Sequence, residues 1–292
     1  MKTYDKSELW NSILESDMFQ DIDLNIFKEE GANTRITQYS HKTHGILFLK
    51  NILFQMATQF QKEELLLLNK VSSRKMGGGI TIDYNGISLD LDYLLALDEI
   101  LFLKDILENV TSVLEIGAGY GRTCHTILSL FPNIKDYHII DFPNMLNLSG
   151  KYLQKVSSEH NYQKITFVPV DNINEQPYDL VINIDSMQEM NADTVCSYLN
   201  FIDKVGGAFY SKNTVGKFDP SVCGWEKSAG SELAMQSGIL REKVNIFCPL
   251  ELATAQGHFL ERFSPGASWI VQKHAVAPPW SHYYQALYKK NA

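Results

Sequence analysis

A glycine-rich stretch in the middle of the chain, VLEIGAGYGRT (113–123), has the residue types of a nucleotide-binding loop. Glycine occupies every second position at Gly117, Gly119 and Gly121, between a short apolar run and the start of a predicted helix. Because glycine lacks a Cβ, such a loop turns tightly and lets a ligand lie against its backbone. The helix that follows begins with free N–H groups. This order of strand, glycine loop and helix predicts the ligand-binding edge of a doubly wound α/β sheet.

The spacing of the glycines argues against a dinucleotide. The dinucleotide fingerprint G-x-G-x-x-G/A needs its last small residue where this chain has Arg122. An acid, Glu115, also stands two residues before the first glycine. Taken alone, the loop fits an ordinary strand-to-helix turn equally well, so its meaning depends on the segments that follow.

Polar residues also follow three later segments that read as strands. The segment YHIID ends in Asp141, an acid placed to accept hydrogen bonds from both hydroxyls of a ribose, or else to cap the helix after Phe142. The β-branched run ITFVPV (165–170) is followed by Asp171 and Asn172. The buried-strand pattern YDLVINI (178–184) is followed by Asp185 and Ser186. Strand ends at these intervals favour a ligand site along one sheet edge.

The pattern E-x-G-x-G-x-G resembles motif I of the class I methyltransferases that use S-adenosylmethionine (SAM). Within that class, GAGYGRT, IIDFPNML and NIDSMQEM resemble a family of bacterial sugar O-methyltransferases, over about residues 77–210. The resemblance implies SAM as cofactor and S-adenosylhomocysteine as product. It implies a glycine loop under the methionine part, adenine contacts after the third strand, and a small acceptor such as a sugar hydroxyl. The predicted cofactor-binding residues are Glu115, Gly117, Ala118, Gly119, Gly121, Arg122, Asp141, Phe142, Asp171, Asn172, Asp185 and Ser186.

A hydroxyl acceptor needs a general base within hydrogen-bond reach. Glu189, four residues past Asp185, is the first candidate, with capping of the next helix as its alternative role; His258 is the second candidate. The predicted acceptor-binding residues are Gln188, Asn213, Tyr84 and His44. N-methylation of an amine, a guanidine or an amino-cyclitol is the rival within SAM chemistry. A non-catalytic SAM-fold protein or an NAD-binding protein is the rival of another class.

The composition of the chain limits which classes of function are possible. The 292 residues carry a formal charge of −8, which argues against a nucleic-acid partner because phosphate backbones bind basic surfaces. The four cysteines are scattered without a C-x-x-C pair, so we expect reduced thiols and no metal site. A polar N-terminus and short apolar runs predict neither a signal peptide nor a membrane span, and hence a cytoplasmic protein.

The predicted fold is α/β: a Rossmann-like class I methyltransferase sheet, parallel with a final antiparallel hairpin, plus an N-terminal helical cap. Residues 1–76 are the expected cap or lid, with a surface for a homodimer. Residues 77–110 read as a hairpin, turning at Asn85-Gly86, and a helix. Residues 111–292 are the expected SAM-binding domain, with an acceptor-binding insertion at about 214–257. Segments 259–263 and 268–272 are expected to form the final hairpin, and the aromatic tail after residue 275 to dock on the body.

Overall fold

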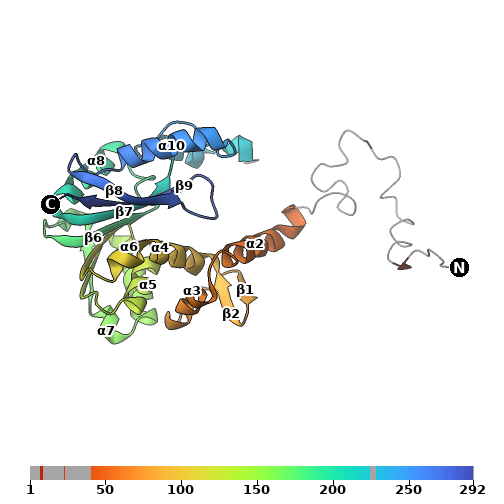
Figure 1. Cartoon of the computed structure of the whole chain (residues 1–292), viewed down its shortest axis with the longest axis horizontal. Coiled ribbons are helices and arrows are strands. Elements are labelled where there is room, and N and C mark those ends of the chain that lie inside the picture. The colour runs from red at the N-terminus through yellow and green to blue at the C-terminus, as the bar shows by residue number, and fades with distance from the viewer. Residues whose placement is uncertain (1–6, 9–22, 24–40, 224–227, 292) are drawn as a thin grey trace.

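The computed structural model describes residues 7, 8, 23, 41–223 and 228–291, and shows one central sheet covered by helices on both faces (Figure 1). Its strands are β3 (Ser112–Ile116), β4 (Asp136–Asp141), β5 (Ile165–Pro169), β6 (Tyr178–Ile184), β7 (Gly206–Thr214), β8 (Trp269–Val276) and β9 (Tyr283–Lys290). Its main helices are α4 (Leu91–Leu107), α5 (Arg122–Leu130), α6 (Pro143–Val156), α8 (Ala192–Val205) and α10 (Pro249–Arg262).

The seven strands lie in the order β5-β4-β3-β6-β7-β9-β8. Counted from β3, the five parallel strands follow the order 3-2-1-4-5 of a doubly wound sheet. The last two strands are antiparallel: β9 pairs with β7 on one side and with β8 on the other. This arrangement confirms the predicted Rossmann-like sheet with a final antiparallel hairpin.

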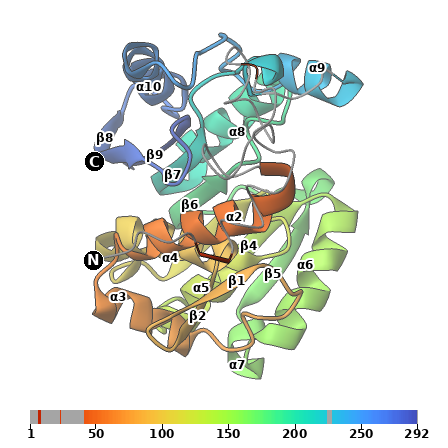
Figure 2. The same ribbon diagram turned by 90° about the vertical axis from the view of Figure 1, so that its right-hand side faces the viewer.

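Both faces of the sheet are apolar because helices cover both of them. One buried cluster joins the sheet to α4, α5 and α6, and contains Leu103, Ile127 and Leu153. The cluster on the other face joins it to α8 and α10, and contains Ile202 and Phe259. Figures 1 and 2 show these two helical layers on opposite sides of the strands. The glycine loop and the strand ends therefore meet at one edge between the layers.

The final hairpin differs from its sequence prediction. Residues 259–263 are not a strand: they end helix α10, which begins at Pro249. Ala255, Phe259 and Phe263 are buried, at the three- to four-residue spacing of one helix face. The hairpin is instead β8 and β9, so the predicted docking tail is an interior strand of the sheet. Its Tyr284 and Tyr288 are buried on the α8–α10 face.

The elements before the sheet form a third buried cluster. Helices α2 (His41–Ala57) and α3 (Lys62–Leu66), the 3₁₀ turn η2 (Leu67–Lys70), the strands β1 (Thr81–Tyr84) and β2 (Ile87–Asp90), and α4 contribute to it. The hairpin is confirmed, with φ of 53° at Asn85 and 80° at Gly86, as a tight Asn-Gly turn requires. Asp90 caps α4 by accepting a hydrogen bond from the backbone N–H of Tyr93 (3.0 Å).

The cap is predicted over residues 1–76, and most of its first 40 residues lie outside the described residues. Its lid and dimer roles stay predictions. The insertion contains η4 (Pro220–Cys223) and α9 (Ala229–Gln236). Across the described ranges, none of the helices is both long enough and apolar enough to span a bilayer.

Candidate functional site

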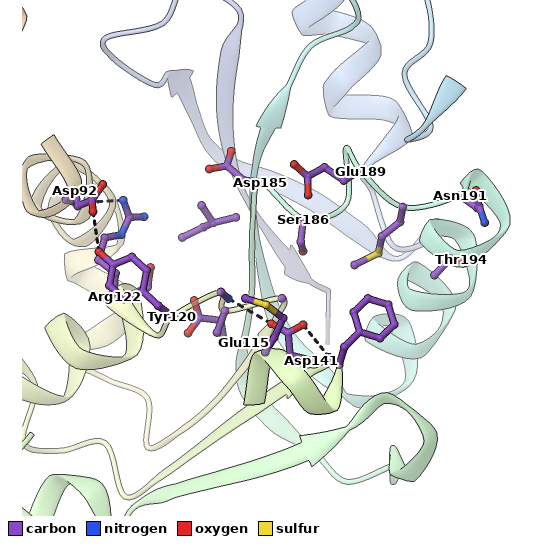
Figure 3. Close-up of a pocket in the computed structure, with 18 residues that line it drawn as sticks. Asp92, Glu115, Tyr120, Arg122, Asp141, Asp185, Ser186, Glu189, Asn191 and Thr194 are labelled. Carbon is purple, nitrogen blue, oxygen red and sulfur yellow. Dashed lines mark hydrogen bonds between the residues drawn. The ribbon is translucent and has the colours of Figure 1, made fainter. Parts of the chain in front are cut away.

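A cavity of about 730 Å³ opens where the sequence predicts a ligand, at the carboxyl ends of β3, β4 and β6 (Figure 3). The glycine loop forms its floor, and the first turns of α4 and α8 complete its wall. Its lining residues are Asp92, Glu115, Gly117, Ala118, Gly119, Tyr120, Arg122, Thr123, Asp141, Phe142, Met145, Ile184, Asp185, Ser186, Glu189, Met190, Asn191 and Thr194. We call it the donor cavity.

Two of the loop glycines are needed for different reasons. Gly117 has a φ of +74°, and a Cβ there would meet the Oγ of Ser186 at 2.2 Å. The Ser186 hydroxyl donates to the carbonyl of Ile116, which ties the end of β3 to the loop after β6. Gly119 has a φ of +59°, and a Cβ there would meet nothing within 4 Å, so its open side faces the cavity. The loop thus offers bare backbone to a ligand.

Asp141 is fixed by the backbone around it. Its two carboxylate oxygens accept hydrogen bonds from the N–H groups of Phe142 (2.8 Å) and Gly119 (3.3 Å). Burial raises the pKa of the Asp141 carboxyl, while these two bonds oppose the shift. The side chain is only partly buried and lines the cavity, so its remaining lone pairs stay available for hydroxyl donors.

Glu115 is almost completely buried, at 2% exposure, yet it reaches the donor cavity. The Tyr137 hydroxyl donates to one of its oxygens at 2.7 Å. Burial raises the pKa of this carboxyl to about 7, against the opposing effect of that hydrogen bond. A cation that reached the free oxygen would favour the ionised form.

Arg122 is held by a buried acid that sequence reasoning missed. Its Nη2 donates to both carboxylate oxygens of Glu99 on α4, at 2.8 and 2.9 Å, and Lys212 Nζ reaches the same acid at 2.8 Å. Glu99 is 0% exposed, so the two cations neutralise it within the protein. Arg122 also donates to the backbone carbonyl of Asp92. These contacts fasten the helix after the glycine loop to α4 and β7.

The lining of the donor cavity is strongly acidic. It contains five carboxylates and one arginine, whose guanidinium is already paired with Glu99. In Figure 3 Asp185 and Glu189 project from the loop after β6, and Asp141 lies on the other side of the cavity. A wall of this charge suits a cationic ligand and repels a pyrophosphate.

A second cavity, of about 1050 Å³, lies beside the first. The loop after β6, the insertion after β7 and the start of β9 form its wall, and we call it the acceptor cavity. Glu189 is the one described residue that lines both cavities. Its side chain is exposed and comes from the loop that precedes α8.

A hydrogen-bonded group stands at this junction. Asp185 adopts a left-handed backbone conformation, with a φ of 63°, which is uncommon outside glycine and frequent at functional sites. Its charge acts on the nearby Tyr283 hydroxyl, which accepts a hydrogen bond from the Gln188 amide at 3.0 Å. Burial, with the charge of Asp185, raises the pKa of Tyr283 to about 12, so the phenol stays protonated.

The structure brings together most of the predicted cofactor-binding residues. Only Gly121, Asp171 and Asn172 of that set are absent from the lining of the donor cavity. Gly121 is buried at the start of α5, with a φ of +95° and Leu153 against its Cα. Asp171 and Asn172 are exposed in a 3₁₀ turn, so their donor contacts stay a prediction.

The predicted acceptor and catalytic residues are more scattered. Gln188 and Glu189 line the acceptor cavity, whereas Asn213 is fully buried in hydrogen bonds to Asn183 and Ser211 and orients the loop after β6 instead. Three others lie elsewhere. His258 is exposed on α10 beside a separate small cavity, Tyr84 packs against Phe54, and His44 lies on α2. The structure gives no support to His258 as a base.

Several lining residues carry no local sequence signal. Asp92 and Tyr120 of the donor cavity bond to each other at 2.9 Å across 28 positions. Tyr283 enters the acceptor cavity because β9 inserts beside β7. Sequence reasoning could have found Tyr283 only by predicting where the last strand lies in the sheet. Among the described residues there is no group of three His, Cys, Asp or Glu side chains placed to hold a metal ion.

No protein-family model and no curated protein sequence matches the chain. Solved structures match at low identity. The mitomycin 7-O-methyltransferase MmcR is 12% identical over 68% of this chain and 57% of its own, with a TM-score of 0.44. The riboflavin-derivative dimethyltransferase RosA of Streptomyces davawensis is 13% identical over 68% and 54%, with a TM-score of 0.46. An O-methyltransferase family protein of Burkholderia thailandensis is 14% identical over 69% and 58%, with a TM-score of 0.43. The chain therefore spans just over half the length of these proteins, and likeness at this level assigns neither a family nor an activity.

Proposed function

We propose that this protein is a SAM-dependent methyltransferase that acts on a small molecule. The observation that carries the proposal is the pairing of two cavities at one carboxylate: an acidic cavity over the glycine loop meets a second cavity at Glu189. A transfer reaction needs two sites that meet at one point. The strand order and the glycine loop support a nucleoside-containing donor in the first cavity.

The residues of the donor cavity fit SAM. Its sulfonium and its ammonium group are both cationic, and the lining offers five carboxylates. Asp141 is oriented by two backbone N–H groups to accept from the ribose hydroxyls. The open side of Gly119 leaves room for the methionine part, and Glu115 lies near enough to the cavity to pair with an ammonium. A dinucleotide would place a pyrophosphate against these acids and is disfavoured.

The chain's residues would position the acceptor and manage its proton. SAM supplies an electrophilic methyl group, whose carbon bonds to the acceptor oxygen while the carbon–sulfur bond breaks and its electron pair stays on sulfur. Glu189, which lines both cavities, is placed to take the acceptor proton. Gln188 fixes the wall beside it, since its amide donates to the Tyr283 hydroxyl and accepts from the backbone N–H of Thr214. The proton then passes from Glu189 to solvent, since this side chain is exposed.

N-methylation is the second candidate. Asp185 and Glu189 both present carboxylates near the junction, as a cationic acceptor would require. The carboxylate that would remove a proton from a hydroxyl would instead hold the acceptor ammonium and take one of its protons, so that the neutral amine attacks the methyl carbon. A mass-spectrometric screen with matched hydroxyl and amino compounds separates these two reactions by the product formed.

Calorimetry and one variant test the proposal. We expect SAM and S-adenosylhomocysteine to bind and NAD not to bind. Glu189→Gln should lower methyl transfer by about 10²–10⁴-fold, the usual contribution of general base catalysis, while the variant still binds S-adenosylhomocysteine. Asp193→Asn, an exposed acid on α8 outside both cavities, is the matched control and should keep full activity. NAD binding without SAM binding would refute the proposal.

A further inference from the structure

The wall of the acceptor cavity is aromatic over much of its length. Three rings follow one another from the junction outward: Tyr283, His282 and Phe218, with centroid separations of 5.1 Å for each neighbouring pair. The indole of Trp280 is 40% exposed and the ring of Phe247 is 67% exposed; both line the same cavity. Ring faces and edges of this kind favour a flat, aromatic ligand.

The polar side chains of this wall are largely bonded to the protein itself. The Gln188 amide donates to Tyr283 and accepts from the backbone N–H of Thr214. The Ser237 hydroxyl donates to the backbone carbonyl of Gln188 and accepts from Lys217. Lys217 also donates to that backbone carbonyl. The remaining serines are also bonded: Ser231 to Ser228, and Ser281 to the carbonyl of Ile246. Few donors and acceptors remain for a ligand.

The polar side chains left for a ligand include the carboxylate of Glu189 at the junction, the hydroxyl of Thr214 and the indole N–H of Trp280. His282 Nδ1 has no hydrogen-bond partner within the described ranges, but the protein buries it. Burial lowers the pKa of His282, so its ring is neutral near pH 7. The cavity therefore matches a ligand with few polar groups at the edge of an apolar body.

A sugar or cyclitol fits this wall poorly. It carries a hydroxyl on nearly every carbon, and each one that loses water without gaining a partner costs about 1–3 kcal/mol. The chemistry of proton removal also favours a phenolic hydroxyl over a sugar hydroxyl as the acceptor. A carboxylate is a weak base, and a phenolic hydroxyl, with a pKa of about 10 in tyrosine, gives up its proton more readily than water at about 15.7.

We infer that the methyl acceptor is a flat, largely apolar aromatic compound with its hydroxyl on the ring, and not a sugar or another polyol. The inference rests on the proposed function and replaces the sugar acceptor that the sequence resemblance implies. The acceptor ring lies along the row formed by Tyr283, His282 and Phe218, with its hydroxyl towards Glu189.

Binding measurements test the substrate class without requiring turnover. Saturation-transfer NMR on the full chain, with and without S-adenosylhomocysteine, would compare 2-naphthol with myo-inositol. We expect signal from 2-naphthol only. Phe218→Ala and Trp280→Ala should each weaken 2-naphthol binding at least fivefold and leave the affinity for S-adenosylhomocysteine unchanged. Leu250→Ala is the matched control, because that side chain is 81% exposed and outside the acceptor cavity.

The outcomes separate this inference from the proposed function. Binding of myo-inositol, absence of 2-naphthol binding, or 2-naphthol binding that neither variant weakens would each overturn the aromatic assignment. If the protein still binds S-adenosylhomocysteine in those cases, the proposed SAM site in the donor cavity stands. Failure to bind S-adenosylhomocysteine, with 2-naphthol bound as described, would instead refute the methyltransferase proposal and leave the second cavity as a binding site for aromatic compounds only.

Discussion

Replacement of Glu115 by Gln should change how the stability of the ligand-free protein depends on pH. The folded-state pKa of this carboxyl is about 7, raised from 4.5 mainly by burial. The folded protein therefore holds a proton that the unfolded chain has lost, so the free energy of unfolding falls as pH rises between these two values. Above about pH 7 the free energy of unfolding has lost the full contribution of this proton, and the loss no longer changes with pH. The amide of the Glu115→Gln variant carries no charge at any pH and escapes this cost.

The magnitude follows from the two pKa values. One pKa unit corresponds to about 1.36 kcal/mol, so the shift from 4.5 to about 7 represents roughly 3 kcal/mol. About 2.5 kcal/mol of this amount should develop between pH 5 and pH 8. The stability of Glu115→Gln relative to the natural chain should therefore rise by about 2.5 kcal/mol over that interval. Loss or gain of contacts with Tyr137 adds only a constant offset.

Reversible urea denaturation at pH 5 and pH 8 measures this difference directly. Other titrating groups contribute equally to both proteins and cancel in the comparison. Glu189→Gln, the same substitution at an exposed carboxylate, is the matched control. A stability difference for Glu115→Gln that is the same at both pH values would refute the reasoning that burial holds a proton on this acid.

Three further predictions address other parts of the site. Asp141→Ala should weaken S-adenosylhomocysteine binding by calorimetry by about tenfold or more, since one lost pair of charge-assisted hydrogen bonds is worth about 1.5–3 kcal/mol; unchanged affinity would contradict the ribose assignment. Gly117→Ala should destabilise the fold far more than Gly119→Ala, because only the first new Cβ meets Ser186, at 2.2 Å; equal melting temperatures would contradict this. Glu99→Ala should lower the free energy of unfolding by about 3–5 kcal/mol by leaving two buried cations unpaired, and a neutral result in urea denaturation would remove its structural role.

The donor half of the site was predictable because its signals are local. The apolar runs of β3, β4 and β6 each end in the residues that line the cavity, and parallel strands bring those ends to one edge. The Asn85-Gly86 turn and the helix 91–107 were likewise specified by neighbouring residues. In each case the residues that decide the structure are adjacent in the sequence.

The acceptor half was not predictable in the same way. The segment Phe-Leu-Glu-Arg-Phe at 259–263 is too short for its period to separate strand from helix, and burial against the sheet made it helical. Tyr283 reaches the site through the pairing of β9 with β7, about 70 residues earlier in the chain. Glu99 pairs with Lys212 across 113 positions. Such contacts are set by the tertiary fold and leave no local pattern.

The insertion of β9 between β7 and β8 also bears on the order in which the two cavities arise. All residues that line the donor cavity lie between 92 and 194, whereas the acceptor cavity requires residues 279–283. Synthesis from the ribosome proceeds from the N-terminus, so the parts of the donor cavity emerge first and the acceptor wall closes near the end of translation. A nascent chain halted before residue 279 would hold the complete set of side chains that line the first cavity but would lack the 279–283 wall of the second.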